Sequence, residues 1–483
     1  MIHHKPLSSA NRKSRLLNQL KIIFLFLVIL FLSIKGFYGM AIALVLLGYI
    51  INEVFFSDHI FYDVKQDYQY NLQAEYSENI LLENNQIIWK KEYANKTLLV
   101  EVELCSTFSG YIFDPYIELK TPSDSQLQYF ERGLKGGRYI NISHINEGSE
   151  HESIEVIFHG CRPVNSKAIL HGFNKPDLSE KNILVIAPHA DDAEIAAFGV
   201  YSQNNSFIAT ITAGELEAEY YESITASKEQ ASQLKGKLRA WDSISIPLWG
   251  GIKADRVIQL GYFCLTLKTM QQKPDQDVQS ITAGLDRPSY FRLYNQWELA
   301  TDETGTASWN NLLADLQEII KQIQPDVIIT AHPEMDPHKD HYYASLAIQE
   351  ACRKCQLSPD FFLYANHYNH TDIFPFGRTG SLHSLAPEFK PGYLSVSPVS
   401  CALDKQMQNN KLMALTMMHD LQIPVPFKKQ LRKKLQYWFL GRHKYQMGYD
   451  EYFRKAVMRN ELFYRVSTKQ LNELFIAHQQ TGE

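Results

Sequence analysis

The chain has few cysteines and no excess of positive charge. Its 483 residues include 6 cysteines, which are too few for a scaffold built on disulfide bonds. A formal net charge of -5 gives the chain none of the basic character of nucleic-acid-binding proteins, so we expect no nucleic-acid partner. Hydrophobic residues are not scarce, since they make up 45% of the chain. The composition is that of a globular protein, and the length predicts about three domains.

The first 52 residues contain no acidic residue and include two apolar runs. Residues 22–34 are apolar apart from one serine, and residues 40–51 are almost as apolar. The apolar stretch as a whole is too long for a cleavable signal peptide, and no small-residue cleavage site is evident. Lysines and arginines precede it, so the positive-inside rule places the N-terminus in the cytoplasm. We expect residues 1–60 to form a membrane anchor.

Two membrane topologies fit these runs. One span from residue 22 to about 46 would place Lys35 in the middle of the bilayer, at a cost of roughly 2.5–3.5 kcal/mol. A helical hairpin with spans near 16–34 and 37–55 places Lys35 at the interface, and each span of about 19 residues can cross the hydrocarbon layer. The hairpin is favoured. It returns the rest of the chain to the cytoplasm, whereas the single span exports it.

Residues 62–172 show the two-residue periodicity of β-strands. Hydrophobic and polar residues alternate over 100–104 and in part over 154–158, and clusters of Gly, Pro, Asn and Ser separate such runs. This pattern predicts an all-β accessory domain of the sandwich type. Cys105 and Cys161 both lie in it. They could form a disulfide, which needs an oxidising compartment, or remain two free thiols.

From about residue 180, short apolar runs alternate with helical stretches. Strands are predicted at 183–187, 207–212 and 326–330, and helices at 213–234, 309–323 and 341–355. The alternation predicts an α/β fold with a Rossmann-like parallel sheet between two layers of helices. No glycine motif typical of dinucleotide binding follows the first strand, so we expect no nucleotide cofactor.

Two polar loops directly follow two of these strands. The first reads Pro-His-Ala-Asp-Asp-Ala-Glu over 188–194, and the second reads His-Pro-Glu-Met-Asp-Pro-His-Lys-Asp-His over 332–341. Ligands of parallel sheets collect at the carboxyl ends of strands, so both loops should meet at one site. Two histidines and one carboxylate are a usual ligand set for Zn²⁺, and a neighbouring carboxylate can act as a base. The loops therefore predict a catalytic metal site.

The pattern Pro-His-x-Asp-Asp, followed later by His-x-Asp-His, resembles the PIG-L/LmbE family of zinc-dependent N-acetylglucosamine de-N-acetylases. The resemblance covers about residues 180–425. It implies that His189, Asp192 and His341 are ligands of Zn²⁺. It also implies that Asp191 is the general base.

The same resemblance suggests roles for four more residues. His338 would stabilise the oxyanion or protonate the leaving amine, and Asp340 would orient a neighbouring histidine. The family tends to carry Arg-x-x-Glu near the sugar, and Arg239 begins the nearest match, with Asp in place of Glu. His419 lies in a segment that resembles the closing helix of the family, and it is a second candidate for contact with substrate.

These observations predict a membrane-anchored zinc-dependent hydrolase that removes the acetyl group from an N-acetylated amino sugar in a glycolipid or polysaccharide. The alternative is a non-catalytic membrane protein that binds glycan and carries a silent deacetylase-like domain. The complete metal set and the intact Asp191 favour the enzyme. Membrane lipid is a second expected partner. The catalytic domain faces the cytoplasm in the hairpin topology and the exported side in the other.

The C-terminal segment 426–483 begins with a basic amphipathic stretch. Over 427–440, apolar residues share one helical face, basic residues occupy the others, and no acid is present. This pattern is typical of a helix that lies in the membrane interface. The alternative is a helix packed on the catalytic domain with a solvated basic face.

The two topologies place residue 70 on opposite sides of the membrane. In the hairpin, a cysteine introduced beside Tyr70 faces the cytoplasm and should resist an impermeant thiol reagent in intact cells. Labelling of intact and permeabilised cells measures this difference. Ready labelling of intact cells would instead establish the single span.

Overall fold

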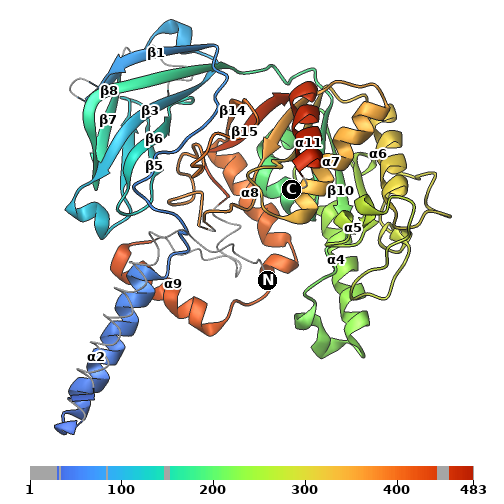
Figure 1. Ribbon diagram of the computed structural model, residues 1–483, viewed down its shortest axis with the longest axis horizontal. Coiled ribbons are helices and arrows are strands. Elements are labelled where there is room, and N and C mark those ends of the chain that lie inside the picture. Colours follow the sequence, from blue (N-terminus) through green and yellow to red (C-terminus); the bar gives the residue numbers. More distant parts are fainter. Residues whose placement is uncertain are drawn as a thin grey trace. The chain divides into compact units, whose positions relative to one another are not determined.

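The computed structural model in Figure 1 describes residues 30–31, 34–82, 85–145, 153–371, 373–442 and 456–481. The chain divides into two compact units. The smaller unit comprises residues 1–58 and 426–444, and the larger comprises residues 59–425 and 445–483. The larger unit contains three β-sheets together with most of the helices. The prediction of a mixed α/β protein is therefore confirmed.

The smaller unit contains a long apolar helix. α2 (Tyr38–Ile51) continues into a π-helical turn, η1 (Asn52–Phe56), and the combined 19 residues are long and apolar enough to cross a membrane. This helix coincides with the second span of the predicted hairpin. The first span, near 16–34, lies almost entirely outside the described residues. The other helix of this unit is α9 (Phe427–Leu440), which ends where Gly441 adopts a left-handed conformation with φ 64°.

The segment expected to be all-β contains two antiparallel four-stranded sheets, with strand orders β1-β8-β3-β6 and β2-β7-β4-β5. Side chains that alternate along the strands, such as Val100 and Val102 on β3 and Val156 on β7, meet in one buried core. Cys105 and Cys161 are both free thiols. The strands are β1 (Tyr76–Leu81), β2 (Gln86–Ile88), β3 (Lys96–Ser106), β4 (Tyr116–Lys120), β5 (Ser125–Tyr129), β6 (Lys135–Asn141), β7 (Ser153–His159) and β8 (Cys161–Asn174).

A seven-stranded sheet with the order β11-β10-β9-β12-β13-β15-β14 carries the polar loops. The five strands from β11 to β13 are parallel, and β15 runs antiparallel to both of its neighbours. The strands are β9 (Ile183–Ala187), β10 (Ser206–Thr212), β11 (Val257–Tyr262), β12 (Val327–Ala331), β13 (Asp360–Tyr364), β14 (Ser397–Ala402) and β15 (Asn460–Ser467).

Helices cover both faces of this sheet, because its central strands are apolar on both sides. Leu184 and Ile186 of β9 face one buried cluster, and Val185 faces the other. The covering helices can be followed in Figure 1. They are α3 (Asp192–Gln203), α4 (Lys228–Trp249), α5 (Leu267–Gln272), α6 (Trp309–Ile323), α7 (Lys339–Lys354), α8 (Lys405–Met417) and α11 (Thr468–Thr481).

One helix begins later than the sequence predicts. The expected helix over 213–234 is a loop and a short 3₁₀ helix, η5 (Glu219–Ile224), followed by α4 from Lys228. The Ser227 side chain caps α4 by accepting a hydrogen bond from the backbone N–H of Gln230. A serine cap supplies a partner for one of the free amides at a helix start, and it defines this boundary.

The sheet also extends beyond the predicted domain boundary at residue 425. β15 lies in the segment predicted as a helical extension, yet it pairs with β13 and β14. Glu461 on β15 accepts hydrogen bonds from the backbone N–H groups of Gly199 and Val200 at 3.0 and 3.1 Å. These amides lie just after the kink of α3 at Ala197. The C-terminal segment therefore helps to shape the helix that begins at Asp192.

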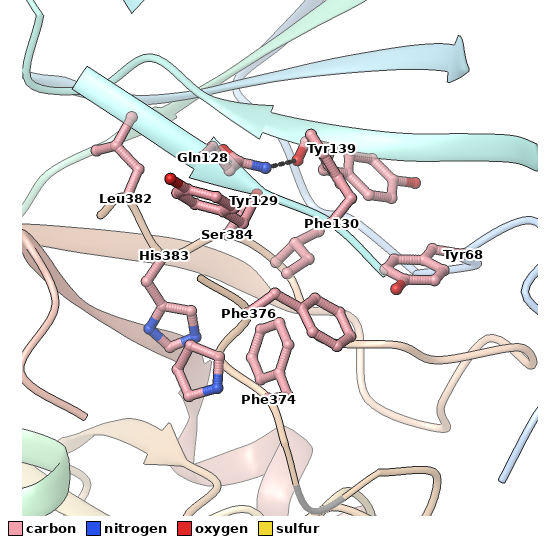
Figure 2. Close-up of a pocket in the computed structure, with 12 residues that line it drawn as sticks. Tyr68, Gln128, Tyr129, Phe130, Tyr139, Phe374, Phe376, Leu382, His383 and Ser384 are labelled. Carbon is pink, nitrogen blue, oxygen red and sulfur yellow. Dashed lines mark hydrogen bonds between the residues drawn. The ribbon is translucent and has the colours of Figure 1, made fainter. Parts of the chain in front are cut away.

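Within the larger unit, the β-sheets pack against β14 and the loop around residues 374–385. Figure 2 shows aromatic rings of this loop beside those of the β-sheets, with Gln128 donating a hydrogen bond to the Tyr139 carbonyl at 2.7 Å. Deeper in the junction, Asn141 donates a hydrogen bond to the Ser400 hydroxyl at 3.0 Å. The remaining cavity has a volume of about 10 Å³. It holds no more than about one water molecule, so the junction is packing rather than a ligand site.

Candidate metal centre and catalytic site

The two polar loops meet at the carboxyl ends of β9 and β12, which are neighbouring parallel strands. The first loop carries His189 and Asp191 and leads into α3, whose first residue is Asp192. The second leads from β12 to α7, with His338 just before the helix and His341 in its first turn. Short loops between a strand and a helix thus bring side chains about 150 residues apart into contact.

Three ligand-type atoms form a nearly equilateral triangle in the centre of this site. The Nδ1 atom of His189 lies 3.2 Å from Oδ2 of Asp192 and 3.3 Å from Nε2 of His341. The third side, from Nε2 of His341 to Oδ2 of Asp192, measures 3.2 Å. The three residues are 9%, 2% and 0% exposed. The arrangement is compact and buried.

Two further carboxylates lie behind the histidine rings. Oδ2 of Asp336 is 2.8 Å from Nδ1 of His341, and Oδ2 of Asp340 is 3.2 Å from Nε2 of His189. A carboxylate accepts the ring proton on its own side, which leaves the lone pair of the other ring nitrogen directed at the triangle. In the neutral form of both rings, each histidine would therefore direct a lone pair to the same point as the Asp192 carboxylate.

The electrostatic surroundings favour a cation at that point. Burial alone would lower the pKa of His341, but Asp192 and Asp336 raise it to about 10. Burial would raise the pKa of Asp192, yet His341 and His189 lower it well below its usual value. The carboxylates that stabilise a protonated imidazole would equally stabilise a divalent ion bound by the neutral rings.

The donor set fits zinc. In a tetrahedral site with zinc–ligand bonds of about 2.0–2.1 Å, neighbouring ligand atoms lie about 3.3 Å apart, which matches the triangle. His338 and Cys264 extend the cluster. His189, His338 and His341 present ligand atoms within 4.8 Å of one another, and so do His189, Cys264 and Asp340. We favour the triangle because all three of its sides measure 3.2–3.3 Å, whereas Sγ of Cys264 lies 3.6 Å from Nε2 of His189.

Asp191 lies beside the triangle in a strained backbone conformation, with φ 121° and ψ -30°. Such a conformation costs roughly 1–3 kcal/mol for a residue other than glycine and often occurs at functional sites. Burial raises the pKa of Asp191 to about 6, against the opposing effect of Arg239. Its carboxylate is thus a stronger proton acceptor than an exposed aspartate.

Arg239 holds this strained turn from behind. Its Nη2 donates hydrogen bonds to the Ala190 carbonyl at 2.7 Å and to Oδ1 of Asp191 at 3.3 Å, while Nη1 pairs with Asp420. The side chain is buried, with 8% exposed. The sequence predicts that Arg239 contacts substrate. In the structure its Nη1 and Nη2 contact these protein groups, and its buried Nε has no hydrogen-bond partner among the described residues.

His338 stands at the edge of the triangle. Its ring centre is 4.8 Å from that of His189 and 4.7 Å from that of His341. Burial and these two rings lower the pKa of His338 to about 3, so the ring is neutral. Its Nδ1 is buried and makes no hydrogen bond within the part of the chain that the structure describes.

His419 lies apart from the triangle, at a groove between α4 and the segment after α8. Its Nδ1 pairs with the buried carboxylate of Asp242 at 2.6 Å. The groove has a volume of about 460 Å³ and is lined by Trp241, Asp242, Ser245, Ile246, Leu248, Trp249, Met417 and His419. His419 directly precedes Asp420, the partner of Arg239, so the polar end of the groove is linked through two residues to Asp191.

Sequence reasoning gave no role to Asp336, Asn366 or Cys264, which the structure places in the site. Asp336 lies in the second polar loop, but its contact with His341 depends on how that loop turns. Asn366 follows β13, a third strand of the same edge, and donates a hydrogen bond to Oδ1 of Asp192 at 2.8 Å. Its backbone N–H also binds Asp336 at 3.1 Å. The position after a strand end was the one available signal for Asn366.

The fold and the cluster define a candidate metal centre at the edge of an α/β sheet. Residues 184–352 match the family model described as PIG-L: GlcNAc-PI de-N-acetylase. The chain therefore carries a PIG-L family domain, and this domain contains both polar loops.

Other comparisons add little. Among curated proteins, none matches the chain. A similar solved structure is that of GalB, the 4-carboxy-2-hydroxymuconate hydratase from Pseudomonas putida KT2440, with 13% sequence identity, 59% of this chain and 95% of that chain covered, and a TM-score of 0.27. This likeness is too low to bear on the fold or the chemistry.

The carboxylate behind His341 should be needed for tight metal binding. Asp336→Asn keeps the size of the side chain but removes its charge, so we expect the affinity for Zn²⁺ to fall by about 10–100-fold. Titration of the metal-stripped protein with Zn²⁺ against a competing chelator measures the affinity. Asp255→Asn removes an exposed carboxylate and is the matched control. Equal affinities in the two variants would contradict the role of Asp336.

Proposed function

We propose that the protein is a zinc-dependent N-deacetylase that removes the acetyl group from an N-acetylated amino sugar. The observation that carries the proposal is the triangle of His189, Asp192 and His341 with Asp191 beside it, inside a PIG-L family domain. A ligand set with a separate adjacent base is what metal-assisted amide hydrolysis requires.

Each residue of the centre has a distinct part in this reaction. His189, Asp192 and His341 would hold Zn²⁺, which when bound supplies Lewis-acid polarisation of the amide carbonyl and of the attacking water. Asp191 accepts the proton that this water loses as its oxygen attacks the carbonyl carbon. Arg239 keeps the Asp191 carboxylate in place at 3.3 Å.

The remaining steps concern the oxyanion and the leaving amine. His338 donates a hydrogen bond to the carbonyl oxygen as negative charge develops there, and its buried Nδ1 is a polar group that no described residue satisfies. The carbon–nitrogen bond then breaks, acetate forms, and the proton taken by Asp191 passes to the amine nitrogen. Asp340 orients the His189 ring throughout.

A glycan chain longer than one sugar is the substrate class that the groove favours. Trp241 and Trp249 expose about half of their surface there, at 48% and 49%. Flat aromatic faces bordered by a polar group suit a sugar, which has apolar C–H faces and hydroxyl edges. We propose that His419 and the two tryptophans bind sugar units that flank the one being deacetylated. The chain would be anchored in the membrane by α2, so that it acts on a polysaccharide or glycolipid near the bilayer.

Substitutions of the adjacent carboxylates Asp191 and Asp192 should have different effects on zinc content and turnover. Asp191→Asn should keep zinc and lose turnover by at least about 10², whereas Asp192→Asn, His189→Ala and His341→Ala should lose zinc. His338→Ala should behave like Asp191→Asn. Zinc content and kcat for acetate release, measured side by side, test this division. Loss of zinc from Asp191→Asn with retention in Asp192→Asn would reverse the assignment of the two carboxylates.

The groove should affect long substrates only. Trp249→Ala removes roughly 60 Å² of apolar contact, worth about 1.5 kcal/mol or about tenfold in kcat/KM for an N-acetylglucosamine oligomer. The kcat/KM for a single N-acetylated sugar should stay unchanged. Tyr393→Ala, which removes an exposed ring outside the groove, is the control. Equal losses on long and short substrates would show that the groove does not bind flanking sugars.

A further inference from the structure

The basic helix α9 packs against the end of the apolar helix. Val54 of η1 forms a buried cluster with Leu435 and Leu440 of α9, and Leu431 packs at its border. All members of this cluster that the structure describes come from residues 50–55 and 431–440. α9 is thus built into the same unit as α2.

Ion pairs complete this junction. Glu53 is only 1% exposed, and its carboxylate lies 2.5 Å from Nε of Arg432 and 3.8 Å from Nζ of Lys428. Arg442, just past α9, donates to both carboxylate oxygens of Asp58 at 2.7 and 2.8 Å. The acids at the end of the apolar helix are therefore neutralised by cations from the α9 segment. A neutralised carboxylate is far less costly near a hydrocarbon layer than a free one.

The outer side of α9 is aromatic and basic. Phe427, Trp438 and Phe439 are 77%, 69% and 53% exposed. Lys429 and Lys434 are exposed as well, and residues 427–440 contain no acid. Large exposed aromatic side chains on a cationic helix are unusual on a water-facing surface and typical of helices at a membrane interface.

We propose that α9 lies on the surface of an anionic phospholipid bilayer, at the level where α2 leaves the membrane. Trp438 and Phe427 enter the region between headgroups and acyl chains, and Lys429 and Lys434 contact lipid phosphates. This proposal rests on the proposed membrane span of α2 and not on the deacetylase activity. In this proposal α2 and α9 form one lipid-binding module, in which α2 crosses the bilayer and α9 lies along its surface.

The positive charge of α9 and the apolar surface that continues from α2 to η1 favour lipid as the partner of this surface. The apolar surface of α2, with Ile42, Leu46 and Leu47 exposed by 52–61%, continues to η1, on which α9 is packed. A protein partner would have to cover both an apolar helix and a cationic one. An anionic bilayer offers acyl chains to the first and phosphates to the second.

Quenching of tryptophan fluorescence by brominated lipid tests the proposal on the full chain. The protein is reconstituted into vesicles of brominated phosphatidylcholine, alone or with about 30% phosphatidylglycerol. We expect phosphatidylglycerol to increase the quenching, and this increase should disappear in Trp438→Phe. It should also disappear in the double variant Lys429→Gln/Lys434→Gln, since each basic residue near an anionic surface contributes about fivefold to binding.

Two controls separate the possible results. Trp309→Phe changes a tryptophan that is 3% exposed in the core of the larger unit, and it should leave the quenching unchanged. Flotation of the vesicles reports the anchoring by α2 independently. Protein that floats while Trp438 remains unquenched overturns the proposal for α9. Quenching of Trp438 without stable flotation would refute the span of α2, and with it the proposed position of α9 where α2 leaves the membrane.

Discussion

Three ligand-type atoms held 3.2–3.3 Å apart in a buried site are the constraint on which the rest of the site depends. Two imidazoles and a carboxylate this close together in a buried site are stabilised by positive charge, which a ring proton or a bound cation would supply. The surrounding structure maintains this arrangement through Asp336 and Asp340 behind the rings and Asn366 on Asp192. The strained turn at Asp191 places a second carboxylate beside the triangle, where its Oδ1 contacts Arg239.

Much of the centre could be predicted because it is local in sequence. His189, Asp191 and Asp192 lie within four positions, directly after a strand that is apolar on both faces, and His338 and His341 follow another. The rule that polar loops meet at the carboxyl ends of parallel strands then brings the two groups together. Arg239 was harder to interpret, because its pairing with Asp420 joins residues 181 positions apart and no local pattern records it.

The segment after residue 425 shows the limit of periodicity. The basic amphipathic pattern of 427–440 correctly predicts a helix. The pattern does not show which residues the apolar side of that helix packs against. In the structure α9 packs against Val54 and pairs with Glu53, and both residues lie near the other end of the chain. β15 was missed for a related reason. Its residues form a strand because β13 and β14 flank it, and both partners precede it by long stretches of chain.

The position of β15 has a consequence for biosynthesis. Among the described strands, β14 pairs in the sheet with β15 alone, and the kinked helix that begins at Asp192 is braced by Glu461. A nascent chain that has passed the second polar loop already contains every triangle residue, yet it lacks this brace and one edge of the sheet. We therefore expect the centre to reach its final arrangement only after residues 460–467 have left the ribosome. During that interval β13 presents an open edge that a chaperone would have to shield.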